Sequence, residues 1–428
     1  MTLAMIALAL LLLIGVPIAF AVGIMSVGYM FAVGGADFLL LVPQRMFAGL
    51  NVFTIMAIPF FFLAAELMTA SKILDDLVEF ADAIVGRFRG GLAHVNVLGS
   101  AFFAGISGSA IADVAGLGAI EIRAMEAAGY DRRFATALTV ASSLIGPIIP
   151  PSIIILLYAS IMQVSVATMF LAAVLPGILL TVMLMIVVAF MARKYDFPKR
   201  NTRYSPVEFL SITVRASSAL LMPLIIMGGI LSGIFTATEA AAVAAFYALV
   251  IGLFAKRTLK LADIYQCLLR SGIMTSVIFL VLATASIFGW IIGLERVPET
   301  MAKALVGITA DPILLLTLIV GLLLIVGMFM DVGAALIVMG PILAPTAISA
   351  GIDPVHFGIV MSLSLVVGLN TPPVGPCLFA AASISRLKIE EISMALIPFY
   401  VVQVVFLAII MLIPSISLWL PQWLGYLK

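Results

Sequence analysis

Apolar runs close to the length of a membrane span follow one another along almost the whole chain. They lie near 52–69, 134–165, 168–191, 214–234, 237–255, 272–293, 355–384 and 394–418, with one or two more inside 2–33. A helix needs about 20 apolar residues to cross a bilayer, so the runs at 134–165 and 355–384 are too long for one unbroken span. The pattern predicts an all-α, polytopic membrane protein.

The charge composition excludes other classes of protein. Of the 428 residues, 64% are hydrophobic and 10% are charged, and the net charge is +1. A soluble domain has about 25% charged residues, and a protein that binds nucleic acid through its charge needs a basic excess. No phosphate loop, nucleophile elbow or HExxH motif occurs in the sequence, so we expect no enzyme activity.

Basic residues assign the sides of the loops. Dense basic loops favour the cytoplasm, and the two clearest are Arg193–Arg203 and Lys256–Lys260. Alternating the runs from these loops places 18 of the 22 Lys and Arg residues inside. This asymmetry supports the topology, although charge leaves open whether 2–33 forms one broken helix or two.

Segment 90–131 has basic residues at both ends and no span between them. Its apolar stretches, 92–105 and 111–125, are each about 14 residues, or about 21 Å of helix, against a hydrocarbon core of about 30 Å. Small residues, Gly105 to Ser109, separate them. We therefore predict a re-entrant hairpin whose tip lies within the membrane.

Segment 310–353 contains no Lys or Arg. Asp-Pro pairs mark both of its ends. We predict a second re-entrant hairpin, entering from the opposite side, with its tip between Gly327 and Gly333. Two true spans remain an alternative here, because 312–329 is almost long enough to cross.

Each predicted hairpin is followed by a run that adjacent prolines break, at Gly146–Ser152 and Gly368–Pro376. The same residue types recur at an offset of 222 positions. The matched pairs are Asp131 with Asp353, Gly146 with Gly368, Pro150 with Pro372, and Pro151 with Pro373. At the tips Asp113 matches Asp331 at an offset of 218, which predicts four extra residues in the second copy. Two copies entering from opposite sides form an inverted repeat, which is typical of secondary transporters.

The proline breaks predict ion sites, because they leave main-chain carbonyls without helical partners. Oxygen ligands suit a hard cation, so we hypothesise two Na⁺ sites. The first would use Ser107, Gly108, Ser109, Gly146 and Pro150. The second would use Gly327, Val332, Gly333, Gly368, Thr371 and Pro373. The substrate would bind between the tips, near Ser107, Ser109, Asn370 and Thr371.

These residues can also have purely structural roles. The prolines can be simple kinks, and the hydroxyl groups can bond to their own helices. Asp113 and Asp331 are intramembrane carboxylates, which are costly to bury and therefore usually functional. Each can instead be the N-cap of the returning helix of its hairpin.

The sequence resembles the large membrane subunit of tripartite ATP-independent periplasmic (TRAP) transporters. The resemblance covers nearly the whole chain and is carried by five motifs: Ala57–Phe61, Gly105–Ala110, Gly146–Ser152, Thr236–Ala241 and Asn370–Gly375. It implies Na⁺-coupled import of a carboxylate, such as a dicarboxylate or sialic acid, across the bacterial inner membrane. It also implies an elevator mechanism, a small membrane subunit of about four helices and a periplasmic substrate-binding protein.

The repeat and the resemblance together divide the chain into seven segments. They are N-terminal scaffold helices (1–51), a scaffold helix with a cytoplasmic arm (52–89), transport repeat 1 (90–166), scaffold helices (167–271), a scaffold helix with a periplasmic-side arm (272–309), transport repeat 2 (310–385) and a C-terminal helix (386–428). The alternatives are a stand-alone Na⁺/dicarboxylate symporter of related architecture, and a channel or assembly scaffold. The substrate's identity stays open.

Overall fold

The structure is a computed structural model, and it describes residues 2–199, 204–297, 300 and 311–427. Within these residues the regular elements are helices, and a single isolated β-bridge joins Arg89 to Lys199. Eight of the described helices are long and apolar enough to cross a membrane, and the bent pair α20–α21 would be a ninth span. The predicted all-α, polytopic membrane fold is therefore confirmed.

The N-terminal region forms two helices where the sequence left one or two open. They are α1 (Thr2–Leu13) and α2 (Ile18–Leu39), followed by α3 (Leu41–Leu50). Gly15, with a φ of 88°, and Pro17, the N-cap of α2, separate the first two. Proline has no amide hydrogen to donate, so it suits the start of a helix and not its interior.

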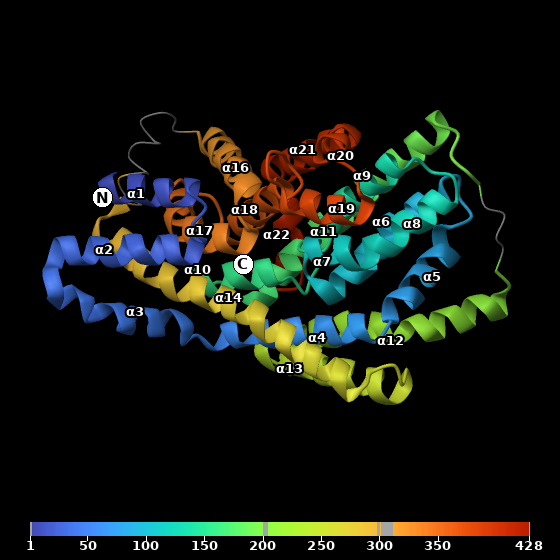
Figure 1. The fold of residues 1–428 in the computed structure, drawn as a ribbon, viewed down its shortest axis with the longest axis horizontal. Helices are drawn as coiled ribbons and strands as arrows, with labels where there is room; N and C mark the ends of the chain where they lie inside the picture. Colours follow the sequence, from blue (N-terminus) through green and yellow to red (C-terminus); the bar gives the residue numbers. More distant parts are fainter. Residues whose placement is uncertain (1, 200–203, 298–299, 301–310, 428) are drawn as a thin grey trace.

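Four helices pack together along the lower part of Figure 1, in segments for which a scaffold is predicted, and we call them the scaffold helices. They are α4 (Ala57–Ala70), α12 (Pro206–Leu231), α13 (Ala237–Val250) and α14 (Leu261–Leu294). Helix α14 also contacts α2 and α3, and it is continuous across residues 271 and 272, where the sequence divided two segments. The arm predicted after this helix lies largely outside the described residues.

Local sequence signals explain where the scaffold helices begin. Helices α12 and α13 each start with a capping box, formed by Ser205 with Glu208 and by Thr236 with Glu239. In a capping box the two side chains satisfy free amide groups of the first turn. Helix α5 (Ile73–Val85) follows α4, buries one apolar face, and contacts α6 and α12. This amphipathic helix lies in segment 52–89, and its place on the cytoplasmic side stays a prediction.

Two structural copies of one unit form the rest of the core. The first copy consists of α6 (Gly91–Ser107), α7 (Ala110–Asp113), the π-helix η2 (Val114–Gly118), α8 (Ala119–Ala127), α9 (Arg132–Ser143) and α10 (Ile153–Met162). The second copy consists of α16 (Pro312–Phe329), α17 (Val332–Ser349), α18 (Pro354–Gly368) and α19 (Pro376–Ser385). Helix α18 is buried from Val355 to Gly368, so it lies in the middle of the molecule.

The structure corrects the register of the repeat at the tips. Helices α6 and α16 end 222 residues apart, at Ser107 and Phe329, and the returning helices α7 and α17 also start 222 residues apart, at Ala110 and Val332. The same offset pairs several glycines: Gly99 with Gly321, Gly105 with Gly327, Gly118 with Gly340, and Gly129 with Gly351. The two copies therefore have equal length. The predicted pairing of Asp113 with Asp331 is wrong, because the position equivalent to Asp331 is Ser109.

The hairpin arms are longer than the apolar stretches that predicted them. Helix α6 has 17 residues, and α16 and α17 have 18 each. At 1.5 Å per residue α6 is about 25 Å long, which approaches the thickness of the hydrocarbon core. Length therefore does not separate a re-entrant arm from a span, and the re-entrant hairpins stay predictions that rest on the flanking charges.

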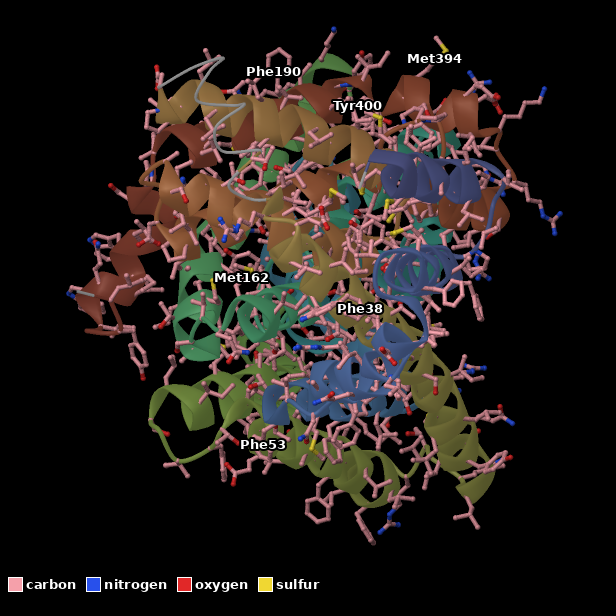
Figure 2. All side chains as sticks on the ribbon, turned by 90° about the vertical axis from the view of Figure 1, so that its left-hand side faces the viewer. Phe38, Phe53, Met162, Phe190, Met394 and Tyr400 are labelled. Atoms are coloured by element: carbon pink, nitrogen blue, oxygen red, sulfur yellow. The ribbon has the colours of Figure 1, made fainter. Side chains whose placement is uncertain are left out.

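The remaining helices pack around the two copies. They are α11 (Val166–Lys194), α20 (Ile389–Ala395), α21 (Ile397–Leu412) and α22 (Ser415–Trp423). Large apolar side chains cover the outside of the molecule, as Phe190, Met394 and Phe53 illustrate in Figure 2. Exposed surface of this kind fits a lipid environment.

Candidate functional site: a pocket between two helix starts

Each copy contains a helix that is interrupted by a proline pair. Helix α9 ends at Ser143 and α10 begins at Ile153, whereas α18 ends at Gly368 and α19 begins at Pro376. The Pro150–Pro151 and Pro372–Pro373 peptide bonds are both cis. Ser152 closes the first break: its hydroxyl donates to the Pro147 carbonyl at 2.5 Å and accepts from the Ile155 amide at 3.3 Å.

The first tip lies directly against the first break. A methyl group added at Gly146 would lie 3.3 Å from the Ser109 carbonyl oxygen, and one added at Gly108 would lie 3.1 Å from the Pro151 oxygen. Gly108 also has a φ of 57°, which favours glycine. The structure thus brings Ser107, Gly108, Ser109 and Gly146 together, with Pro150 in the facing break.

The second tip meets the second break in the same way. A methyl group added at Gly368 would lie 2.5 Å from the Gly327 carbonyl carbon, so only glycine fits this contact. The Gly375 amide donates to the Met328 carbonyl at 3.1 Å, which ties the far end of the break to the tip. Thr371 donates to the Val367 carbonyl at 3.0 Å, so its hydroxyl bonds to its own helix. Pro373 lies within this break.

Both tips line one pocket of about 90 Å³. The lining residues are Phe62, Gly108, Ser109, Ala110, Ile111, Ile153, Ile154, Leu157, Ile278, Asp331, Val332, Gly333 and Leu369. Phe62 and Ile278 belong to scaffold helices α4 and α14, so the pocket lies where the repeats meet the scaffold. Sequence reasoning did not find these two side chains, because each is an ordinary apolar residue of a span.

Two helices begin at this pocket. Ser109 caps α7 by accepting from the Ala112 amide at 3.4 Å, and Asp331 caps α17 by accepting from the Gly333 and Ala334 amides at 3.0 Å and 3.4 Å. The capping alternative is therefore confirmed for Asp331. It is wrong for Asp113, which lies in the first turn of α7 behind Ser109. Helix starts carry partial positive charge, which favours anions.

Only one of the four predicted substrate residues lines the pocket. Ser109 does, whereas Ser107 is 4% exposed and lies behind it. Asn370 is fully buried, and its amide donates to the Val140 carbonyl of α9 at 2.7 Å. The Tyr400 hydroxyl donates to the Asn370 carbonyl at 2.7 Å. Asn370 thus joins the second break to α9 and α21, and its neighbour Leu369 reaches the pocket instead.

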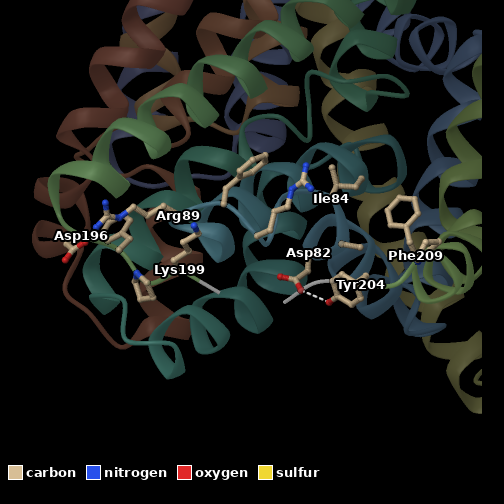
Figure 3. A pocket seen from close by; sticks show the side chains of 13 residues that line it. Asp82, Ile84, Arg89, Asp196, Lys199, Tyr204 and Phe209 are labelled. Atoms are coloured by element: carbon tan, nitrogen blue, oxygen red, sulfur yellow. Dashed lines mark hydrogen bonds and ion pairs between the residues drawn. The ribbon is translucent and has the colours of Figure 1, made fainter. Parts of the chain in front are cut away.

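A larger cavity lies elsewhere, between the end of α5, the residues that follow α11 and the start of α12 (Figure 3). Its volume is about 1310 Å³, and it contains Arg87, Arg89 and Lys199. Arg89 pairs with Asp196, and the Tyr204 hydroxyl donates to Asp82 at 2.7 Å. This cavity involves neither tip, so we do not assign the transport site to it.

The fold and this pocket define a multi-pass membrane transporter with two copies of a hairpin and broken-helix unit. The chain belongs to the family described as tripartite ATP-independent periplasmic transporter, DctM component, whose model matches residues 5–416. It is therefore a large TRAP permease of the bacterial inner membrane and not an enzyme.

Comparisons with individual proteins agree with the family. The chain is 37% identical to the sialic acid TRAP transporter large permease protein SiaM of Vibrio cholerae, over 97% of both chains. It is 38% identical to the C4-dicarboxylate TRAP transporter large permease protein DctM of Pseudomonas aeruginosa, over 89% of both chains. The Alcanivorax borkumensis YdaH transporter has a similar fold, with a TM-score of 0.61, 14% identity, and 92% and 90% of the two chains covered.

Proposed function

We propose that this chain imports an organic acid across the inner membrane, coupled to Na⁺, by an elevator movement of its two repeats. Organic acid transport follows from the family and from relatives named for sialic acid and C4-dicarboxylates. The observation that carries the finer proposal is that both hairpin tips line one and the same pocket.

The chemistry of the pocket fits an anion held with a cation. Among the described residues that line it there is no Lys or Arg, and Asp331 is the one charged side chain. An organic anion beside this carboxylate would be repelled unless positive charge is supplied nearby. The helix starts supply part of that charge.

Na⁺ at the tips would supply the remainder. The residues that would hold it offer hydroxyl and main-chain oxygen atoms: Ser107, Gly108, Ser109, Gly146 and Pro150 at the first tip, and Gly327, Val332, Gly333, Gly368, Thr371 and Pro373 at the second. Oxygen atoms are the ligands that hard cations prefer. Bound Na⁺ would therefore favour binding of the organic anion, and the anion would favour binding of Na⁺.

The elevator proposal rests on where the pocket lies. Both tips and both breaks belong to the two repeats, whereas Phe62 and Ile278 belong to the scaffold. A rigid displacement of the repeats past α4 and α14 would carry both tips and both breaks across the membrane together, and only the contacts with Phe62 and Ile278 would break. The partners of such a subunit are a small membrane subunit and a periplasmic binding protein, which would deliver the carboxylate.

Uptake into proteoliposomes tests the proposal. The two membrane subunits are reconstituted, the binding protein and a labelled sialic acid or C4-dicarboxylate are added outside, and external Na⁺ is replaced by K⁺. We expect uptake in Na⁺ only, and only with the binding protein present. Undiminished uptake in K⁺ would contradict Na⁺ coupling, and uptake of free substrate without the binding protein would favour a stand-alone symporter.

A further inference from the structure

A buried carboxyl group lies inside the first hairpin, away from the pocket. Glu121 is on α8, is 4% exposed, and has no hydrogen-bond partner for either carboxylate oxygen among the described residues. A methyl group added at Gly99 of α6 would lie 2.8 Å from Glu121 Oε1, so the carboxyl group is pressed between the two arms of the hairpin. A buried carboxylate without partners is among the most costly groups in a protein.

Neighbouring polar side chains direct their hydrogen atoms elsewhere. The Asn96 amide donates to the Thr139 hydroxyl at 2.7 Å, and the Ser142 hydroxyl donates to Asn96 Oδ1 at 2.8 Å. The Ser100 hydroxyl donates to Ser142 at 3.1 Å. Each hydroxyl has one hydrogen to donate. The donor that remains for the Glu121 carboxyl group is therefore the second amide hydrogen of Asn96, which lies beside it. This cluster is rich in acceptors and poor in donors.

Among the residues that the structure describes, no basic group offsets the charge of Glu121. Helices α6, α9 and α19 and the π-helix η2 pack against α8. Their ionisable side chains are His94, Arg132, Arg133 and Cys377. Arg132 and Arg133 pair with Glu126 at 3.7 Å and Glu391 at 2.8 Å, and Arg123 of α8 itself donates to the Ala119 carbonyl. Asp113 of α7, whose charge acts on Glu121, is itself an acid.

We propose that Glu121 is a proton-binding site within the first hairpin, at which the bound proton neutralises the carboxylate that Asn96 and Gly99 enclose. The proton removes the buried charge and converts one acceptor into the donor that the cluster lacks. If the hairpin moves as proposed above, this proton travels with it. That consequence depends on the proposed function, whereas the proton site does not.

Infrared spectroscopy of the purified protein tests the site without transport. A protonated carboxyl group has a C=O stretching band that an ionised carboxylate lacks. We expect this band at neutral pH in the wild-type protein, and we expect E121Q to reduce it by the intensity of one carboxyl group. E126Q is the matched control, because Glu126 lies on the same helix with an exposed side chain, and it should leave the band unchanged.

A second variant keeps the test valid if E121Q does not fold. G99A places a methyl group against Glu121 Oε1 and should shift the band without removing it. The same band intensity in E121Q as in the wild type, or an unshifted band in G99A, would overturn the proposal. A band that disappears when Na⁺ is added would also overturn it, because a metal ion would then be the resident cation.

Discussion

Glycine pairs determine how closely each tip approaches its break. Gly327 and Gly368 touch through their backbones, and neither position has room for a side chain. Gly108 and Gly146 bring the first tip to the same kind of contact. At the residue scale, the absence of a Cβ atom is what lets main-chain oxygen atoms from two separate segments converge.

Gly368→Ala should therefore destabilise the protein. The new methyl group would lie 2.5 Å from the Gly327 backbone, and such overpacking costs about 1–3 kcal/mol. We expect a lower melting temperature in detergent and a loss of uptake. Gly321→Ala is the control, because no atom lies within 4 Å of the methyl group it adds on α16. Equal melting temperatures for the two variants would contradict this account of the contact.

The side chain of Asn370 acts across the repeats and not within the pocket. Removing it in N370A deletes the bond to the Val140 carbonyl, which keeps the Ser143 hydroxyl as a donor at 2.8 Å, so the loss is that of one hydrogen bond, about 0.5–1.5 kcal/mol. We expect reduced thermal stability together with weaker Na⁺ dependence of uptake, because the second break loses its anchor on α9. Asn51, which is exposed, provides the control variant N51A. A variant as stable as N51A would show that the anchor is dispensable.

At the scale of elements, the two returning helices start with different residues at equivalent positions. Ser109 caps α7 and Asp331 caps α17, and the two residues are 222 positions apart. Both side chains accept from amides of the first turn, so the helix start is the shared feature and the residue type is not. The acid is found on one side of the pocket only.

Exchanging the caps tests this equivalence. S109A should lose the cap of α7 and about 1 kcal/mol of stability. S109D should retain the cap, because the aspartate at position 331 caps the equivalent helix α17. Thermal unfolding distinguishes the two variants. S109D should nevertheless reduce substrate uptake, because it adds a second negative charge to the pocket. Equal unfolding of S109A and S109D would show that the cap contributes little.

On the scale of the whole molecule, the pocket joins the repeats to the scaffold helices. Ile111 belongs to the first repeat and Ile278 to scaffold helix α14, and both line the same pocket. If the repeats move past the scaffold, this contact must break and re-form in every transport cycle.

A cross-link between the first repeat and α14 should therefore stop transport. In the double variant I111C/I278C, a reducible thiol-reactive cross-linker should abolish uptake, and reduction should restore it, because Ile111 is 37% exposed and a cysteine there can react. The single variants I111C and I278C are the controls, since the native Cys267 and Cys377 are buried. Full uptake by the cross-linked double variant would contradict relative movement at this contact.

Much of the architecture could be predicted from the sequence, because its causes are local. Apolar length predicts the spans, adjacent prolines predict where α9–α10 and α18–α19 are interrupted, and serine, threonine or aspartate before an apolar run predicts helix starts such as Thr236. The repeat is visible in the breaks because adjacent prolines occur in the sequence only at these two places.

Only the tertiary structure decided which residues share the pocket. Matching the two aspartates alone gave the wrong register, because the shared role at the tips is an N-cap that serine and aspartate both perform. Phe62 and Ile278 have no polar signal, and the Asn370 partner lies 230 residues away. Local sequence determines where a helix begins and breaks, whereas contacts between distant segments depend on how all the helices pack together.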